Sequence, residues 1–209
     1  MKRSRRSLSV ALLAVLGATL WVSGAGAASK LSPAFAGGKL SSKVRRVAAE
    51  TLPANGGFEG SLQGWAGYRA TLSLVAPGAS GANAARVSLK GTATDYSIFR
   101  AGRIVSSATA GSVYSARAWV RSATPGRQVC LRIREWAGET VSGSAKSCVT
   151  TSSDWKRFPA LAYKVAVSGH AVDVYAYGWR AVPGDSFDLD DVTLSGDGAA
   201  PAQTPPPPP

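Results

Sequence analysis

The residues best suited to chemistry lie in one stretch near the C-terminus, Val172–Leu194. Read with the two-residue period of a strand, Asp173, Tyr175, Tyr177 and Trp179 fall on one side and small or β-branched residues on the other. Rings that face solvent from neighbouring strands form flat apolar platforms for a ligand. The opposite assignment, with the rings in the core and the aliphatic side chains outward, has the same period and stays open at this point.

The same stretch ends in two adjacent acids, Asp190 and Asp191. The apolar alternation that runs to Leu189 resumes with the opposite parity at Val192. This break predicts a β-bulge at the acids, which would re-aim one carboxylate.

The N-terminus predicts export. A basic start is followed by the apolar run Leu8–Val22 and by Ala25-Gly26-Ala27, so residues 1–27 are typical of a signal peptide. A membrane anchor is the alternative, but it prefers about 20 apolar residues. We therefore expect a secreted, extracellular protein with no membrane contact after signal cleavage.

Composition divides the remaining chain into three parts. Residues 28–50 are rich in Ala, Ser, Gly and Lys and predict a flexible N-terminal segment, whereas residues 51–195 predict one globular domain. Residues 196–209 form a proline-rich linker or tail. Such a linker is typical both of a fragment with an appended catalytic domain and of a plain spacer.

The net charge of +12 does not indicate a nucleic-acid partner. Many of the basic residues belong to the signal and the N-terminal segment, and residues 51–195 hold 15 Lys and Arg against 10 Asp and Glu. These basic residues are scattered singly rather than clustered, so we expect no nucleic-acid binding.

Turn formers recur about every ten residues with short strand-like runs between them, which predicts an all-β fold built as a sandwich of two antiparallel sheets. The large residues Phe58 and Trp65 are expected to plug the core, and Trp119 to stack with Arg117 and Arg121. The expected strands are Thr71–Val75, Ala84–Leu89, Tyr96–Arg100, Ser112–Arg121, Gln128–Trp136, Ser142–Thr150, Arg157–Val165, Ala171–Trp179 and Ser186–Leu194.

Cys130 and Cys148 are the only cysteines, and an even pair in an exported protein predicts a disulfide. A hairpin with its loop at Ala137–Val141 places the two residues directly opposite each other. The same register sets Trp136 opposite Ser142, Arg134 opposite Ser144 and Arg132 opposite Lys146.

The opposed charges of Arg132 and Lys146 repel each other. An anionic ligand over them would relieve this repulsion. The alternative is that both long side chains turn apart into water.

Several motifs together resemble the jelly-roll carbohydrate-binding modules with a galactose-binding-like fold that are grouped as families four, nine and twenty-two. The resemblance covers roughly residues 52–194. Its motifs are Asn55-Gly56-Gly57-Phe58-Glu59, Gly64-Trp65, Tyr114–Arg121, Asp154-Trp155, Gly184-Asp185-Ser186-Phe187 and Leu189-Asp190-Asp191-Val192.

The resemblance implies a structural calcium ion. In such modules the opening acid and an aspartate of the last strand share a calcium, which nominates Glu59 and Asp190, with Asp191 as the alternate and backbone carbonyls near Asn55 completing the shell. Calcium takes six to eight oxygen ligands in irregular geometry. The alternative is an acid cluster that is solvated or paired with arginine.

The jelly-roll topology also implies that the strands at 96–100, 171–179, 128–136 and 142–150 form one sheet. Its outer face would gather aromatic rings and guanidinium groups into a binding surface for a polysaccharide, acidic ones included. The expected binding residues are Trp136, Tyr175, Tyr177, Trp179, Arg132 and Arg134.

No catalytic constellation is evident, so we do not expect an enzyme. His170 is the only histidine and is expected at the surface, while Glu135 and Glu139 lie on or beside the hairpin loop, where solvation is expected rather than the raised pKa of a glycosidase acid. The leading hypothesis is non-catalytic polysaccharide binding that targets an appended enzyme. The alternative is a secreted structural or adhesion module that binds protein through the same face.

Overall fold

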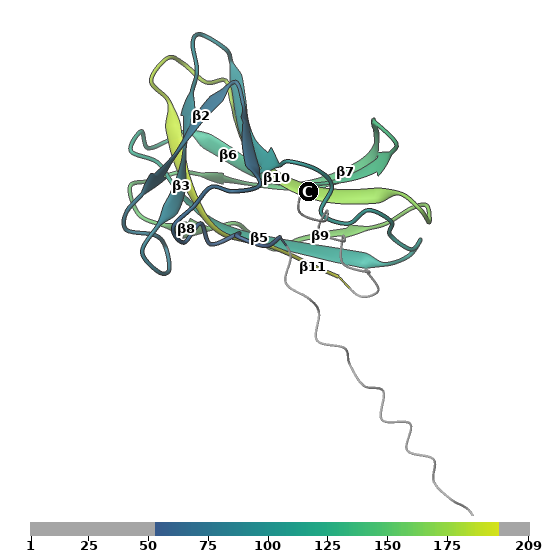
Figure 1. Ribbon diagram of the computed structural model, residues 1–209. Coiled ribbons are helices and arrows are strands. Elements are labelled where there is room, and N and C mark those ends of the chain that lie inside the picture. The colour runs from purple at the N-terminus through teal and green to yellow at the C-terminus, as the bar shows by residue number, and fades with distance from the viewer. Residues whose placement is uncertain (1–52, 197–209) are drawn as a thin grey trace, which may run out of the picture. The chain divides into compact units, whose positions relative to one another are not determined.

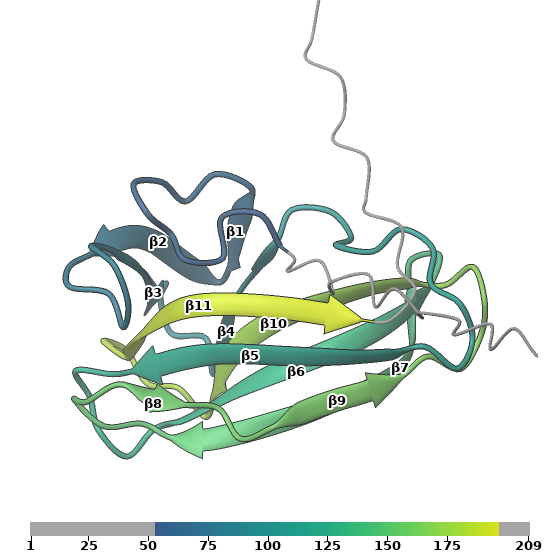
Figure 2. The ribbon, with the colours of Figure 1, turned by 90° about the horizontal axis from the view of Figure 1, so that it is seen from below.

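The computed structural model describes residues 53–196, which form eleven strands and no helix (Figure 1). The strands build two antiparallel sheets that pack face to face (Figure 2). This confirms the predicted all-β sandwich. Within the described residues there is no helix long and apolar enough to cross a membrane.

The five-stranded sheet has the order β1-β4-β10-β6-β7. It contains the four strands that the jelly-roll topology assigned to one sheet, with β1 added at the edge beside β4. Its strands are β1 (Trp65–Tyr68), β4 (Asp95–Arg100), β6 (Gln128–Ala137), β7 (Thr140–Thr150) and β10 (Ala171–Trp179).

The six-stranded sheet has the order β2-β3-β11-β5-β8, and β9 pairs with the same strand β5. The prediction of a single strand at 157–165 is wrong, because this segment forms two strands, β8 and β9. Pro159 lies between them and has no N–H to donate to a neighbouring strand. The strands are β2 (Ala70–Val75), β3 (Ala84–Leu89), β5 (Val113–Arg121), β8 (Lys156–Arg157), β9 (Leu161–Lys164) and β11 (Ser186–Gly196).

Strand alternation explains the core between the sheets. Val172, Val174 and Ala176 of β10 are completely buried, as the two-residue period predicts for one face of the strand. Phe58 and Trp65 also belong to the core, with ring centroids 5.1 Å apart, so both are core plugs as expected.

The β6–β7 hairpin confirms the disulfide between Cys130 and Cys148 and the cross-strand pairs Arg132–Lys146 and Arg134–Ser144. The pairing of Trp136 with Ser142 is wrong. The turn consists of residues 138–139 alone, so it is shorter than the expected loop. A bulge after Glu135 pairs Trp136 with Val141. Both strands are therefore longer than predicted.

The predicted bulge at the two acids is also present. The register of β11 against β5 shifts between Asp190 and Thr193, and Asp191 has a positive φ of 49°. The bulge keeps Leu189 and Val192 in the core although their parities differ. The expected signal peptide, the whole N-terminal segment 28–50 and residues 197–209 of the proline-rich tail lie outside the described residues.

Candidate functional site

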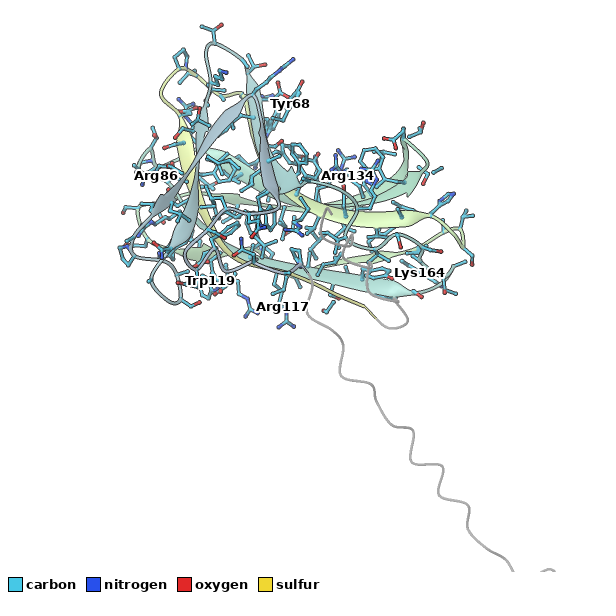
Figure 3. All side chains as sticks on the ribbon, viewed as in Figure 1. Tyr68, Arg86, Arg117, Trp119, Arg134 and Lys164 are labelled. Carbon is cyan, nitrogen blue, oxygen red and sulfur yellow. A yellow bond between two sulfur atoms is a disulfide. The ribbon has the colours of Figure 1, made fainter. Side chains whose placement is uncertain are left out.

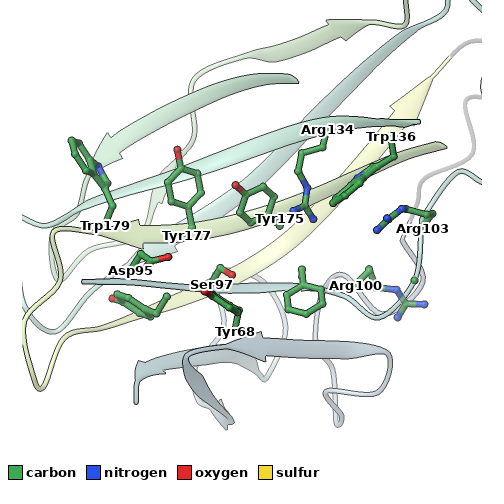
Figure 4. A pocket seen from close by; sticks show the side chains of 13 residues that line it. Tyr68, Asp95, Ser97, Arg100, Arg103, Arg134, Trp136, Tyr175, Tyr177 and Trp179 are labelled. Atoms are coloured by element: carbon green, nitrogen blue, oxygen red, sulfur yellow. The ribbon is translucent and has the colours of Figure 1, made fainter. Parts of the chain in front are cut away.

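A groove of about 520 Å³ crosses the outer face of the five-stranded sheet (Figure 4). One wall is formed by β10 and β6 and the other by β1, β4 and the loop that follows β4. Its lining includes Trp179, Tyr177, Tyr175, Arg134 and Trp136 on the first wall.

The exposure of β10 decides between the two face assignments. Tyr175 and Tyr177 are half-buried and line the groove, and Trp179 is 41% exposed. Val172, Val174 and Ala176 point into the core. The aromatic side of β10 is therefore the outer side, and the alternative assignment is excluded.

The first wall is a stacked row rather than a set of free platforms. Tyr175 and Tyr177 stack with their ring centroids 5.3 Å apart, and the Arg134 guanidinium lies 4.0 Å from the Tyr175 ring centroid. Trp136 continues the row, with Arg134 at 4.6 Å and Arg103 at 3.6 Å from its ring. In Figure 4 these residues follow one another along the groove. Tyr175 thus has both ring faces covered and offers mainly its edge and hydroxyl to a ligand.

A buried carboxylate fixes this row. Asp173 is 2% exposed and accepts two hydrogen bonds from Arg134, from Nε at 2.8 Å and from Nη2 at 2.7 Å. Arg103 lies farther away, with Nη1 3.9 Å from the same carboxylate. A bidentate pair of this kind orients the guanidinium plane. Arg134 is therefore a fixed part of the groove wall, and its Nε and Nη2 donors are already bound to Asp173.

Trp179 is the ring with the most accessible surface in the row. Its indole N–H donates to Gln128 Oε1 at 2.9 Å, which fixes the ring orientation. Arg180 lies over the ring at 4.4 Å from the centroid. The ring is therefore held in place while 41% of the residue stays exposed.

The second wall was not predicted from the sequence. Tyr68 of β1 is 46% exposed, and Phe99 of β4 is half-buried beside it. The alternation of β4 carried the signal, since Asp95, Ser97 and Phe99 share the parity opposite to the buried Tyr96 and Ile98. β1 is four residues long and carries no such alternation, so Tyr68 could not be placed.

Arg132 lies on the same outer face but does not line the groove. Its guanidinium donates to Ser144 Oγ at 2.6 Å and to the Tyr175 hydroxyl at 3.5 Å. Arg132 is bound to Ser144 and Lys146 is exposed, which supports the alternative that the two long side chains turn apart. The role of Arg132 at the groove is to hold Tyr175.

Most charges around the groove are paired. Arg69 pairs with Asp95, Arg134 with Asp173, and Arg103 with Glu139. Arg100 is the exception among the lining cations, since among the described residues its side chain donates only to Gln63 O, at 3.3 Å, and burial lowers its pKa. Burial raises the pKa of the Tyr177 hydroxyl, so this hydroxyl stays protonated near neutral pH as a hydrogen-bond donor.

The residues nominated for calcium divide into two groups. The acids converge on the loop 78–83: Asp190 Oδ2 accepts from Ala79 N at 2.7 Å, and Glu59 Oε2 accepts from Ala82 N at 3.0 Å. Asp191 Oδ1 accepts from Ser80 Oγ at 2.9 Å. None of the three acids forms an ion pair with arginine within the described part of the chain, so the alternative of an arginine-capped cluster is not what the structure has.

Asn55 does not belong to this group. Its side-chain amide donates to Ser61 O and Gln63 O, and its carbonyl accepts from Trp65 Nε1 at 3.0 Å. Asn55 therefore organises the 55–65 loop, and its carbonyl already has a donor. The expectation that this carbonyl completes a calcium shell is not supported.

The oxygens at the loop 78–83 nevertheless fit a hard cation. Ser80 O, Asn83 O and Asp190 Oδ2 lie 2.3, 2.6 and 2.8 Å from the position that a Cβ atom would take at Gly78. Burial raises the pKa of Asp190, although three backbone N–H groups oppose the shift. Among the described residues no three His, Cys, Asp or Glu side chains are grouped to hold a metal, so a calcium ion here would depend on backbone carbonyls.

Glu135 is not solvated, contrary to the expectation. It is 1% exposed, and its carboxylate accepts from the Tyr163 hydroxyl at 2.6 Å and from the backbone N–H groups of Ala166 and Val167. His170 is likewise half-buried rather than at the surface, with Nδ1 2.7 Å from Glu135 Oε1. Strand parity explains the burial, because Glu135 shares the inward face of β6 with Leu131 and Ile133.

These contacts lower the pKa of Glu135. Burial alone would raise it, but the hydrogen bonds from Tyr163, Ala166, His170 and Val167 together outweigh burial. Glu139 has a side chain that is 98% exposed and that pairs with Arg103. Glu135 thus lacks the raised pKa of a general acid, and its carboxylate already has four partners.

The predicted stacking of Trp119 between two arginines is wrong. Arg121 instead lies over the Trp155 ring, 4.6 Å from its centroid, and bonds Asp188. Asp188 is 2% exposed on β11 and holds Arg121 away from Trp119. Within residues 53–196, Trp119 takes part in no ring stacking and no cation–π contact.

The fold is shared with solved proteins at low sequence identity. An arabinose-bound GH51 α-L-arabinofuranosidase matches with a TM-score of 0.58 and 16% identity over 71% of this chain and 26% of that one. The CBM22-1 xylan-binding domain of Xyn10C from Paenibacillus barcinonensis matches with a TM-score of 0.52 and 13% identity, over 73% of this chain and 98% of that one. A cyclase from Fischerella sp. TAU matches with a TM-score of 0.52 and 16% identity, over 75% of this chain and 100% of that one.

These matches show the fold. The chain has the same β-sandwich fold as the xylan-binding domain, which agrees with the resemblance that the sequence motifs carry. The chain spans about a quarter of the arabinofuranosidase that it matches. No known family profile matches the sequence, and no curated protein matches it.

Proposed function

We propose that this chain is a non-catalytic module that binds an extracellular polysaccharide in the groove of the five-stranded sheet. The observation that carries the proposal is the lining, with aromatic side chains on both walls and hydroxyl and guanidinium groups between them. Sugar rings have apolar C–H faces and a rim of hydroxyls, so this mixture matches their chemistry. The xylan-binding domain with the same fold supports the proposal.

We assign the main binding energy to Trp179 and Tyr68, which lie on opposite walls and are the two most exposed rings of the groove. The stacked row of Tyr177, Tyr175 and Arg134 supplies ring edges, hydroxyls and N–H groups. Because the row is held by Asp173, it costs little conformational entropy to order on binding.

The proposed ligand of the groove is a neutral glycan. Three ion pairs neutralise most of the surrounding charge, and Arg100 is the lining cation without a carboxylate partner within residues 53–196. An acidic polysaccharide in this groove, which the sequence also suggested, gains support from Arg100 alone.

Secretion is part of the same proposal. The disulfide between Cys130 and Cys148 is typical of proteins from oxidising compartments, which supports export. The proline-rich composition of residues 196–209 suits a spacer to an appended catalytic domain.

Affinity electrophoresis in gels that contain xylan, β-glucan, cellulose derivatives, arabinan or pectin tests the proposal. We expect at least one neutral glycan to retard the wild type, and Trp179→Ala and Tyr68→Ala to weaken binding about tenfold or more. Trp119→Ala removes the same kind of ring from the other sheet and is the matched control, with unchanged retardation by the neutral glycans.

Two outcomes would overturn the proposal. Equal retardation of wild type and Trp179→Ala by every glycan would remove the groove as the site. If no glycan is retained while a purified protein partner binds through Trp179 and Tyr68, the adhesion function replaces carbohydrate binding.

A further inference from the structure

A second groove, of about 440 Å³, lies on the outer face of the other sheet. It runs over β5, β8 and β11, on the side of the molecule away from the first groove. Figure 3 shows Arg117 and Trp119 projecting from this side, opposite Arg134. The side chains that matter here are Arg117, Trp119, Arg157, Asp191, Thr193 and Ser195.

Two arginines of this groove differ from the others in the described chain. Residues 53–196 contain eleven arginines, and nine of them are held by an ion pair, a hydrogen bond or an aromatic ring. Arg117 and Arg157 form no such side-chain contact with other described residues, and both are exposed. Two cations with free donors therefore face one groove.

A tryptophan lies between these cations. Trp119 is directly opposite Arg157 in the β5–β8 pairing, and Arg117 precedes it by two residues on the same face of β5. These spacings place the Cα atom of each arginine within about 4.5–7 Å of the Trp119 Cα atom. Trp119 is half-buried and its ring is not stacked on any described residue.

Polar groups complete the surface. Thr193 is directly opposite Arg117 in the β5–β11 pairing, and Ser195 lies two residues further on the same face of β11. Asp191, placed by the bulge, contributes one carboxylate that also accepts from Ser80 Oγ. The groove thus combines two unpaired guanidinium forks, one ring, two hydroxyls and one carboxylate.

We propose that this groove is a second binding site, specific for an acidic polysaccharide. A guanidinium fork binds the carboxylate of a uronic acid in bidentate geometry, while the sugar ring lies on Trp119. The hydroxyls and Asp191 bind the sugar hydroxyls. Asp191 repels a densely charged phosphate backbone or an anionic membrane more than a uronic acid polymer, which carries one charge per sugar and also offers hydroxyl donors to this carboxylate.

The site does not depend on the function of the first groove. The two surfaces lie on different sheets and share no lining residue. Loss of one by substitution therefore leaves the other intact, and the failure of either proposal is recognisable separately.

The test uses the full chain in affinity gels with polygalacturonate and with its methyl-esterified form, which keeps the sugar backbone but removes the charge. We expect polygalacturonate to retard the wild type and the ester to do so at least tenfold less. Arg117→Gln/Arg157→Gln and Trp119→Ala should each weaken polygalacturonate binding about tenfold or more, and added salt should weaken it further. The control Lys90→Gln/Lys146→Gln removes two exposed positive charges elsewhere and should bind as the wild type.

Three results would overturn the proposal. Binding that is equal in the wild type and in Arg117→Gln/Arg157→Gln excludes the site. An equal loss in the lysine control shows that net charge alone is responsible. Tighter retention by DNA or by anionic vesicles, lost in the arginine variant, assigns the groove to another class of partner.

Discussion

At the residue scale, Asp173 is the side chain on which the geometry of the first groove depends. Its carboxylate is buried and holds Arg134 against Tyr175 and Trp136. Removing one partner of a buried ion pair leaves the other charge uncompensated, which costs more than the pair contributes.

We expect Asp173→Ala to destabilise the protein by about 3 kcal/mol and to weaken glycan binding, because Arg134 would leave its place in the row. Urea unfolding and affinity electrophoresis measure the two effects. Asp173→Asn keeps the shape and one acceptor, so it should lie between the wild type and Asp173→Ala. Unchanged stability in Asp173→Ala would contradict the role assigned to this carboxylate.

The lowered pKa of Glu135 predicts that the stability of the protein depends on pH. Its pKa is lower in the folded protein than in the unfolded chain, so its contribution is present above the unfolded value of about 4.3–4.5 and is lost as the pH falls further. Glu135→Gln should destabilise the protein by about 1–3 kcal/mol at pH 7 and make stability less dependent on pH between about 5 and 3.

Urea unfolding of the wild type and Glu135→Gln at pH 7, 5, 4 and 3 gives this measurement. Tyr163→Phe, which removes one of the four donors, should show a smaller effect. Parallel pH profiles for the wild type and Glu135→Gln would refute the lowered pKa. The burial of Glu135 could be read from the parity of β6, but its donors come from residues 163–170, which are distant in sequence.

At the element scale, the sequence determined most of the sheet topology. The hairpin of Cys130 and Cys148 placed β6 beside β7, and the resemblance to jelly-roll modules placed β4 and β10 in the same sheet. The errors occur at local features that the two-residue alternation of apolar residues does not predict. These are the bulge after Glu135, the break at Pro159 and the short strand β1. The second wall of the groove was missed because it lies partly on β1.

The loop 78–83 and the bulge of β11 form the proposed calcium site. We propose that the oxygens of Asp190, Ser80 and Asn83 hold calcium, with Glu59 closing over the same loop. The ion would supply positive charge that compensates the buried carboxylate of Asp190.

Thermal unfolding in calcium and in chelator tests this proposal. We expect the midpoint to be several degrees higher in calcium, since a ligand that binds only the folded state stabilises it. Asp190→Asn should abolish the difference, whereas Asn55→Ala, which removes a side chain outside the group, should keep it. The same midpoint in calcium and in chelator would contradict the site.

At the scale of the whole molecule, the two sheets present surfaces of different chemistry. The five-stranded sheet carries rings and paired charges, and the six-stranded sheet carries a ring beside two arginines that have no side-chain partner in the described part of the chain. The overall charge did not reveal this difference, because ion pairing depends on contacts between strands. The two proposed sites together would let the molecule bind two glycans at once, one neutral and one acidic.

The most direct test of the central claim is NMR observation of the tryptophan indole N–H signals during titration with a neutral oligosaccharide from a glycan that retards the wild type. We expect the Trp179 signal to shift with saturation, because its ring lies in the groove of the five-stranded sheet, while the Trp119 signal stays unchanged. A saturable shift of Trp119 with no change at Trp179 would contradict the claim.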